Sequence, residues 1–114
     1  MTRTTYDRPM ASIYLYEITG SVTFREAVEL PRGSIATVKV VNRKAEVLAA
    51  AAFEVFGVPH DFTLMIDRAD VPDPRKLSVW AVLRSEAGVW GTPDLVSAAE
   101  LPVTIHLRKI DVEE

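Results

Sequence analysis

Two histidines and three regularly spaced aspartates are the residues whose chemistry could support catalysis or metal binding. His60 and His106 could serve as general bases or metal ligands, but such sites need several groups that converge on one point. No spacing in the chain brings a serine and an aspartate to either histidine. Asp67, Asp70 and Asp73 could offer carboxylate oxygens to calcium, yet the EF-hand spacing is absent and neighbouring cations can neutralise them. We therefore interpret the aspartates as helix-capping residues and expect no catalytic residue, no metal site and no cofactor.

The composition excludes several other kinds of chemistry. The chain contains no cysteine, which excludes disulfide scaffolds, Cys-ligated metals and thiol catalysis. Thirteen basic against sixteen acidic side chains give a net charge of −3, so nucleic acid is not an expected partner. No stretch approaches the roughly 18 uncharged apolar residues of a membrane span, and we expect none.

The pattern of apolar residues predicts the strands that position these groups. Residues 14–30 alternate between mostly apolar and mostly polar positions, which is typical of a half-buried β-strand. Gly20 interrupts the alternation and predicts a bulge or a bend where the strand changes partner. Residues 77–83 are almost continuously apolar, which predicts a central strand covered on both faces. We expect Trp80 within this strand, and Trp90 in the next, to pack in the core.

One segment is ambiguous when the residues are taken alone. Residues 45–56 contain four consecutive alanines and fit the apolar face of a helix, but alternate residues in them also fit a buried strand. The whole chain shows about seven short strands with turn signals at regular spacing, which predicts an all-β fold, a β-sandwich. A length of 114 residues supports one hydrophobic core. We expect a flexible tail over residues 1–11 and a single β-sandwich domain over residues 12–114.

Several short motifs follow one another between residues 18 and 110. They read ITGSVTFRE (18–26), LPRGS (30–34), TVKV (37–40), PHDF (59–62), DP with LSVWA (73–74 and 77–81) and GVWGT (88–92). In this order they resemble the YbaY/YscW family, which groups small bacterial lipoproteins and type III secretion lipoprotein chaperones, or pilotins.

The resemblance implies an immunoglobulin-like or transthyretin-like β-sandwich, with a strand rather than a helix within residues 45–56. It implies no catalytic residues, because family members look like binding or chaperone modules. Family lipoproteins carry a signal peptide and a lipidated cysteine, and this sequence shows neither. We therefore expect a cytoplasmic protein, although family members are often envelope lipoproteins. Because of this departure, outer-membrane anchoring and a secretin-piloting role do not follow from the resemblance.

The first strand offers the candidate binding site of a non-enzymatic protein- or peptide-binding module. Ile13, Tyr14, Leu15 and Tyr16 are uncharged and apolar on both faces, so we expect them to form an edge strand. An edge of this kind can pair with an extended segment of a partner, either an unidentified protein or peptide or a second copy in a homodimer. Two alternatives remain: a carrier of a small apolar ligand between the sheets and, ranked lowest, a small hydrolase.

Overall fold

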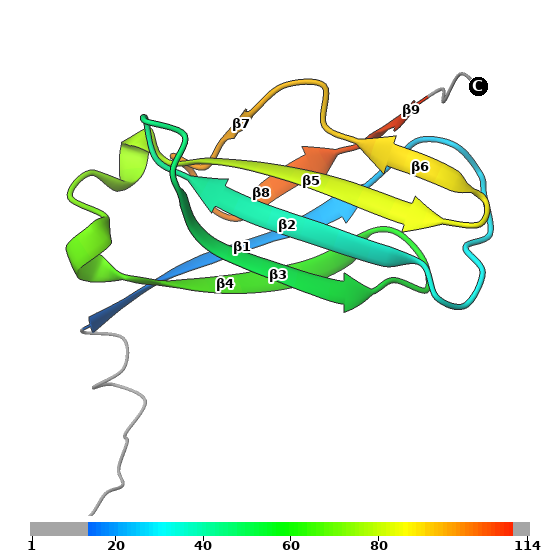
Figure 1. Ribbon diagram of the computed structural model, residues 1–114, viewed down its shortest axis with the longest axis horizontal. Helices are drawn as coiled ribbons and strands as arrows, with labels where there is room; N and C mark the ends of the chain where they lie inside the picture. Colours follow the sequence, from blue (N-terminus) through cyan, green and yellow to red (C-terminus); the bar gives the residue numbers. More distant parts are fainter. Residues whose placement is uncertain (1–13, 111–114) are drawn as a thin grey trace, which may run out of the picture.

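The computed structural model describes residues 14–110 and shows the predicted all-β fold (Figure 1). The described part of the chain forms nine strands, where the sequence predicts about seven, and two single-turn 3₁₀ helices between β4 and β5. The elements are β1 (Leu15–Thr23), β2 (Ile35–Val41), β3 (Val47–Glu54), β4 (His60–Asp67), η2 (Arg68–Asp70), η3 (Pro74–Lys76), β5 (Ser78–Ser85), β6 (Gly88–Gly91), β7 (Val96–Ser97), β8 (Val103–His106) and β9 (Arg108–Ile110). The predicted tail over residues 1–11 lies outside the described residues.

The strands form two sheets that lie one over the other (Figure 1). The three-stranded sheet has the order β4-β1-β8, and the six-stranded sheet has the order β3-β2-β5-β6-β9 with β7 paired to one end of β5. Neighbouring strands are antiparallel except β1 and β8, which run parallel. This arrangement confirms the predicted β-sandwich.

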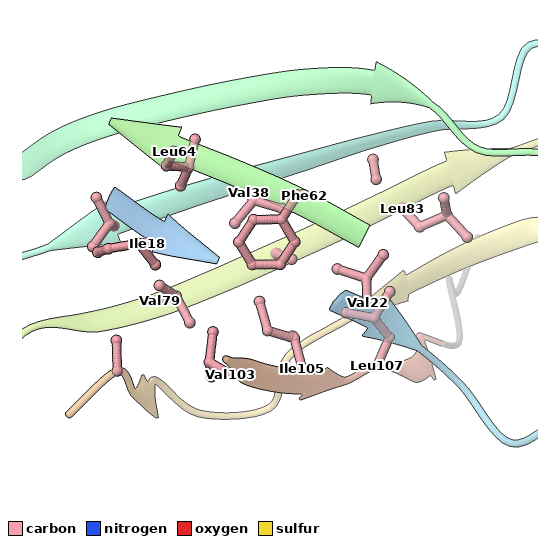
Figure 2. Close-up of a cluster of buried hydrophobic side chains, with 14 of the residues drawn as sticks. Ile18, Val22, Val38, Phe62, Leu64, Val79, Leu83, Val103, Ile105 and Leu107 are labelled. Carbon is pink, nitrogen blue, oxygen red and sulfur yellow. The ribbon is translucent and has the colours of Figure 1, made fainter. Parts of the chain in front are cut away.

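The core consists of side chains that alternate along the strands and point from each sheet toward the other. Figure 2 shows them meeting between the sheets. The labelled residues are Ile18, Val22, Val38, Phe62, Leu64, Val79, Leu83, Val103, Ile105 and Leu107, all of them buried. Their packing argues against the alternative of a small ligand carried between the sheets.

The ambiguous segment contains strand β3, as the family resemblance implies, and not a helix. β3 pairs with β2 along its length, with Ala51 opposite Val38 and Ala50 opposite Lys39. The intrinsic preference of alanine for helix is worth only a few tenths of a kcal/mol per residue over most others, and the backbone hydrogen bonds of the ladder outweigh it. β3 lies at one edge of the six-stranded sheet.

Gly20 marks the point where β1 gains its second partner, but it forms no bulge. The register between β1 and β4 runs unbroken from Leu15 to Val22, while pairing with β8 begins at Gly20, opposite Val103. A Cβ atom at Gly20 would overlap the Val103 carbonyl oxygen and the Phe62 ring. The glycine is therefore required by the close approach of a neighbouring strand, which is a different reason from the predicted bulge.

The two tryptophans lie on opposite faces of the six-stranded sheet, so one of the two core predictions is wrong. Trp90 is completely buried, stacks on Phe24 with ring centroids 4.7 Å apart, and donates a hydrogen bond from Nε1 to Glu26 at 3.1 Å. Trp80 is half-buried and pairs with Lys39 on the side turned away from the core. A continuous apolar run does not reveal which alternate residues face the core, and here only one face of β5 is covered.

Two of the three aspartates, Asp67 and Asp73, cap the 3₁₀ helices as predicted, whereas Asp70 lies within η2 and is not a cap. Asp67 accepts a hydrogen bond from the Ala69 backbone N–H at the start of η2, and Asp73 accepts one from the Arg75 backbone N–H at the start of η3. The Arg75 guanidinium also donates to the Asp73 carboxylate from Nε at 3.0 Å and from Nη2 at 3.2 Å. This hydrogen bonding lowers the pKa of Asp73 below its ordinary value of 3.8.

Candidate binding surface

The six-stranded sheet presents a second face to the exterior, opposite the core. Residues directly opposite one another in an antiparallel pair point to the same side, so the strand registers identify the residues of this face. We define it as the outer face. Its members are Ile35, Thr37, Lys39, Ala50, Ala52, Glu54, Trp80, Val82, Arg84, Val89, Gly91, Arg108 and Ile110.

The centre of the outer face is apolar and uncovered. Ile35 is 39% exposed and Ile110 45% exposed, and Val89 lies in the same line across the sheet. Val89 is half-buried, as are Val82 and Trp80 further along β5. Within residues 14–110 no further layer of structure packs over them. Contiguous apolar surface of this kind marks an interaction site more often than an ordinary solvated surface.

Cations lie beside this apolar centre and also within it, because Arg84 separates Ile35 from Val89. The Lys39 ammonium lies over the Trp80 ring, with Nζ 5.1 Å from its centroid. Arg84 lies directly opposite Ile35 on the neighbouring strand. Arg108 lies opposite Gly91 of β6, which in turn lies opposite Val82 of β5. Such cations favour a partner that brings negative charge to the edge of an apolar contact.

The carboxylate on the outer face, Glu54, already has a partner. Its Oε2 accepts a hydrogen bond from the Gly33 backbone N–H at 2.8 Å. In the described part of the chain, no carboxylate lies within ion-pair distance of Lys39, Arg84 or Arg108. The three cations are therefore not neutralised within that part of the molecule.

The exterior of the three-stranded sheet has the opposite character. The β1–β4 ladder places Glu17, Asp61 and Asp67 on this exterior, together with hydroxyl side chains such as Thr19 and Thr63. The same ladder also places Leu15 and Met65 on this exterior, and Met65 is 51% exposed. The other side chains there are mostly hydroxyl and carboxylate groups, which are readily hydrated. The two exteriors of the sandwich thus differ in both hydrophobicity and sign of charge.

A shallow cleft of about 330 Å³ extends the outer face beside Trp80. The segment after β6 forms its wall with Thr92, Asp94 and Leu95, and Leu95 is 54% exposed. Two hydrogen bonds hold this wall against β5: the Thr92 N–H donates to the Ala81 carbonyl at 3.1 Å, and the Ala81 N–H donates to Thr92 Oγ1 at 3.3 Å. The cleft therefore has a fixed position next to the tryptophan.

The histidines take no part in a catalytic arrangement. His60 stacks on Phe53 with ring centroids 5.0 Å apart. His106 is exposed and lines a cleft of about 720 Å³ with Glu26 and the cations Arg25, Arg108 and Lys109. Among the described residues, no three histidine, aspartate or glutamate side chains are grouped to hold a metal ion.

The residues predicted to form a binding edge lie at the start of the three-stranded sheet. Tyr14 is 63% exposed, and Leu15 and Tyr16 pair with Asp67 and Ile66 of β4, while Ile13 lies outside the described residues. β1 as a whole is the central strand of its sheet, but β8 reaches only residues 20–23. Over residues 15–19, no strand of the described chain pairs with the second edge of β1.

Sequence reasoning missed the outer face, although a signal for it was present. Both β5 and β3 are apolar at odd and at even positions, as in residues 77–83. In a two-layer sandwich, only every second residue of a strand can face the core. When the other residues of the strand are apolar too, they are available for contact with a further partner.

The fold and the surface together define a small β-sandwich with an apolar, cation-bordered face and no catalytic arrangement among its described residues. The chain belongs to the YscW family of type III secretion system lipoprotein chaperones, which matches residues 15–106. The family resemblance noted in the sequence is therefore confirmed, and so is the prediction of a non-enzymatic protein, because this family is of the chaperone type.

A solved structure also points to the pilotin and chaperone class of proteins. The chain is similar to an alternative pilotin from the type II secretion system of Vibrio cholerae, with a TM-score of 0.74 and 25% sequence identity. The similarity covers 86% of this chain and 99% of the pilotin. Comparison with curated protein sequences gives no significant match.

The relatives bear on location as well. The family is that of type III secretion system lipoprotein chaperones, which is consistent with association with the cell envelope. No helix within residues 14–110 is long and apolar enough to cross a membrane. The cytoplasmic location expected from the sequence stays a prediction.

Proposed function

We propose that this protein is a pilotin-like chaperone that binds a segment of a secretion-system protein, such as a secretin, on the outer face of its six-stranded sheet. The observation that carries the proposal is the uncovered apolar centre around Trp80, on a sheet whose other face is fully occupied by the core. The family and the V. cholerae pilotin support a protein partner in secretion.

The physical basis of the proposal is the removal of apolar surface from water. A partner that covers Trp80, Val82 and Ile110 would dehydrate a continuous patch and gain about 25 cal/mol for each Å² buried. Tryptophan is also among the residues that most often dominate binding energy at protein interfaces. The fixed cleft beside Trp80 offers room for one large side chain of the partner.

A photo-crosslinking residue in place of Trp80 tests this function in the native host. We expect it to capture an envelope protein of a secretion system, identified by mass spectrometry. The matched control carries the same photo-crosslinker in place of Thr63, which lies on the exterior of the three-stranded sheet and should not give this product. Equal capture from both positions, or capture of no secretion-system protein, would contradict the proposal.

The open edge of β1 supports a second mode of binding. Over residues 15–19 the backbone groups directed away from β4 have no strand partner in the described chain. Edges of this kind accept an extended segment by β-augmentation. We propose that this edge pairs with a second copy of the chain, which is the simplest source of such a segment.

Sedimentation analysis measures the self-pairing directly. We expect the wild-type protein to show a reversible monomer–dimer equilibrium at about 100 µM, because short ladders give only micromolar affinity. An Ile13→Lys, Leu15→Lys double variant should remain monomeric, since lysine on an edge strand opposes pairing. If both proteins are monomers at this concentration, the edge does not self-pair.

A further inference from the structure

We propose that the segment bound on the outer face is acidic and amphipathic, with apolar side chains directed at the Trp80 region and carboxylates directed at Lys39, Arg84 and Arg108. This inference rests on the proposed function and adds the chemistry of the partner. It is carried by two properties of the same face: an uncovered apolar centre and three cations that no carboxylate of the described chain neutralises.

The positions of the cations set the spacing that the partner must match. Lys39 lies four residues along β2 from Ile35, and Ile35 is directly opposite Arg84. At about 3.3 Å per residue and 4.8 Å between strands, the two cations are attached roughly 14 Å apart. A segment that reaches both needs carboxylates about four residues apart if it is extended. A helical segment needs them about 11 residues apart, because residues at that spacing lie on the same side of a helix and about 16.5 Å from each other.

The other occupants fit these observations less well. The exterior of the three-stranded sheet of a second copy is acidic, with Glu17 and Asp61, but its apolar area is small. Met65 and Leu15 lie there among hydroxyl groups, so this exterior would cover the Trp80 region only in part. An anionic membrane would gain about 1 kcal/mol from each nearby cation, but Glu54 would be pressed against the same charged lipids. An acidic protein segment covers the apolar centre and can still leave Glu54 at the rim.

Two synthetic peptides test the charge requirement. One is a fluorescently labelled amphipathic peptide of about 18 residues with leucines on one face and glutamates beside them, and the other has lysine in place of each glutamate. Measured by fluorescence anisotropy at about 0.1 M salt, where the Debye length is about 10 Å, the acidic peptide should bind at least about tenfold more tightly than the basic one. The Lys39→Glu, Arg84→Glu variant should reverse this preference.

A matched variant controls for net charge. Arg43→Glu, Lys44→Glu makes the same change of charge in the exposed turn between β2 and β3, away from the outer face. This control should bind the acidic peptide within about twofold of wild type, because exposed charges more than a Debye length away are screened. Circular dichroism establishes that both variants keep the fold.

Several outcomes would overturn the inference. They are equal binding of the two peptides, an equal loss of affinity in both double variants, or binding to phosphatidylglycerol vesicles that depends on Trp80 while neither peptide binds. The proposed function is tested separately by crosslinking at position 80. If that crosslink forms and also forms in the Lys39→Glu, Arg84→Glu background, the function stands and the acidic-partner inference fails.

Discussion

Replacement of Trp90 by alanine is expected to lower the free energy of unfolding by about 3–5 kcal/mol, the range found for buried aromatic residues truncated to alanine. Trp90 is completely buried and lies directly opposite Leu83 on the core side of the β5–β6 pair. The change removes its stack on Phe24 and its hydrogen bond to Glu26. It also leaves a cavity that the surrounding strands cannot close without breaking their pairing. Urea unfolding followed by far-UV circular dichroism measures the loss.

Trp80→Ala is the matched control, because it is the same change on the opposite face of the same sheet. Trp80 is half-buried and contacts Lys39 rather than the core, so we expect a loss of about 1 kcal/mol or less. A loss of unfolding free energy as large as that of Trp90→Ala would mean that Trp80 supports the fold. Its exposure would then not be evidence for a binding residue at this position. A small loss makes Trp80→Ala suitable for measuring binding without a change in folding.

The second large effect is expected at Gly20. Even one added methyl group, in Gly20→Ala, would overlap the Val103 carbonyl oxygen, the Val103 side chain and the Phe62 ring. Because Val103 is held opposite Gly20 by the parallel β1–β8 pairing, its backbone can move only by opening that ladder. We expect a loss of about 3 kcal/mol, the upper end for overpacked cores, in the same urea experiment.

Gly57→Ala provides the comparison for Gly20. A Cβ atom at Gly57 would meet no atom within 4 Å, and its backbone is outside the left-handed region. The added methyl group also restricts the unfolded chain, so we expect no loss and a gain of up to about 1 kcal/mol. If the two glycine variants had similar stability, the close approach of β8 would not be the reason that position 20 is a glycine.

The alternation of apolar residues along the chain determined the class of fold. Alternate positions in β1 and β4, such as Ile18, Val22 and Leu64, face the core as their spacing indicates. Helix capping could also be predicted from the sequence, because a capping aspartate accepts a hydrogen bond from the backbone two residues away, as Asp67 and Asp73 do. Such features depend on neighbours in sequence and need no knowledge of the rest of the molecule.

Only the tertiary structure decided which residues form the binding surface. The outer face joins residues from five strands, from Ile35 to Ile110, and their proximity depends on strand order and register. In β5 both sets of alternate residues are apolar, so the sequence could not tell whether Trp80 or its neighbours Val79 and Ala81 face the core. The register with β2 determines the answer. Val38 and Val40 face the core, so Ala81 and Val79, which lie directly opposite them on β5, face it too. Trp80 therefore points outward, beside Lys39. A side chain's direction in a sheet is set by its partners across the ladder, and those partners are distant in sequence.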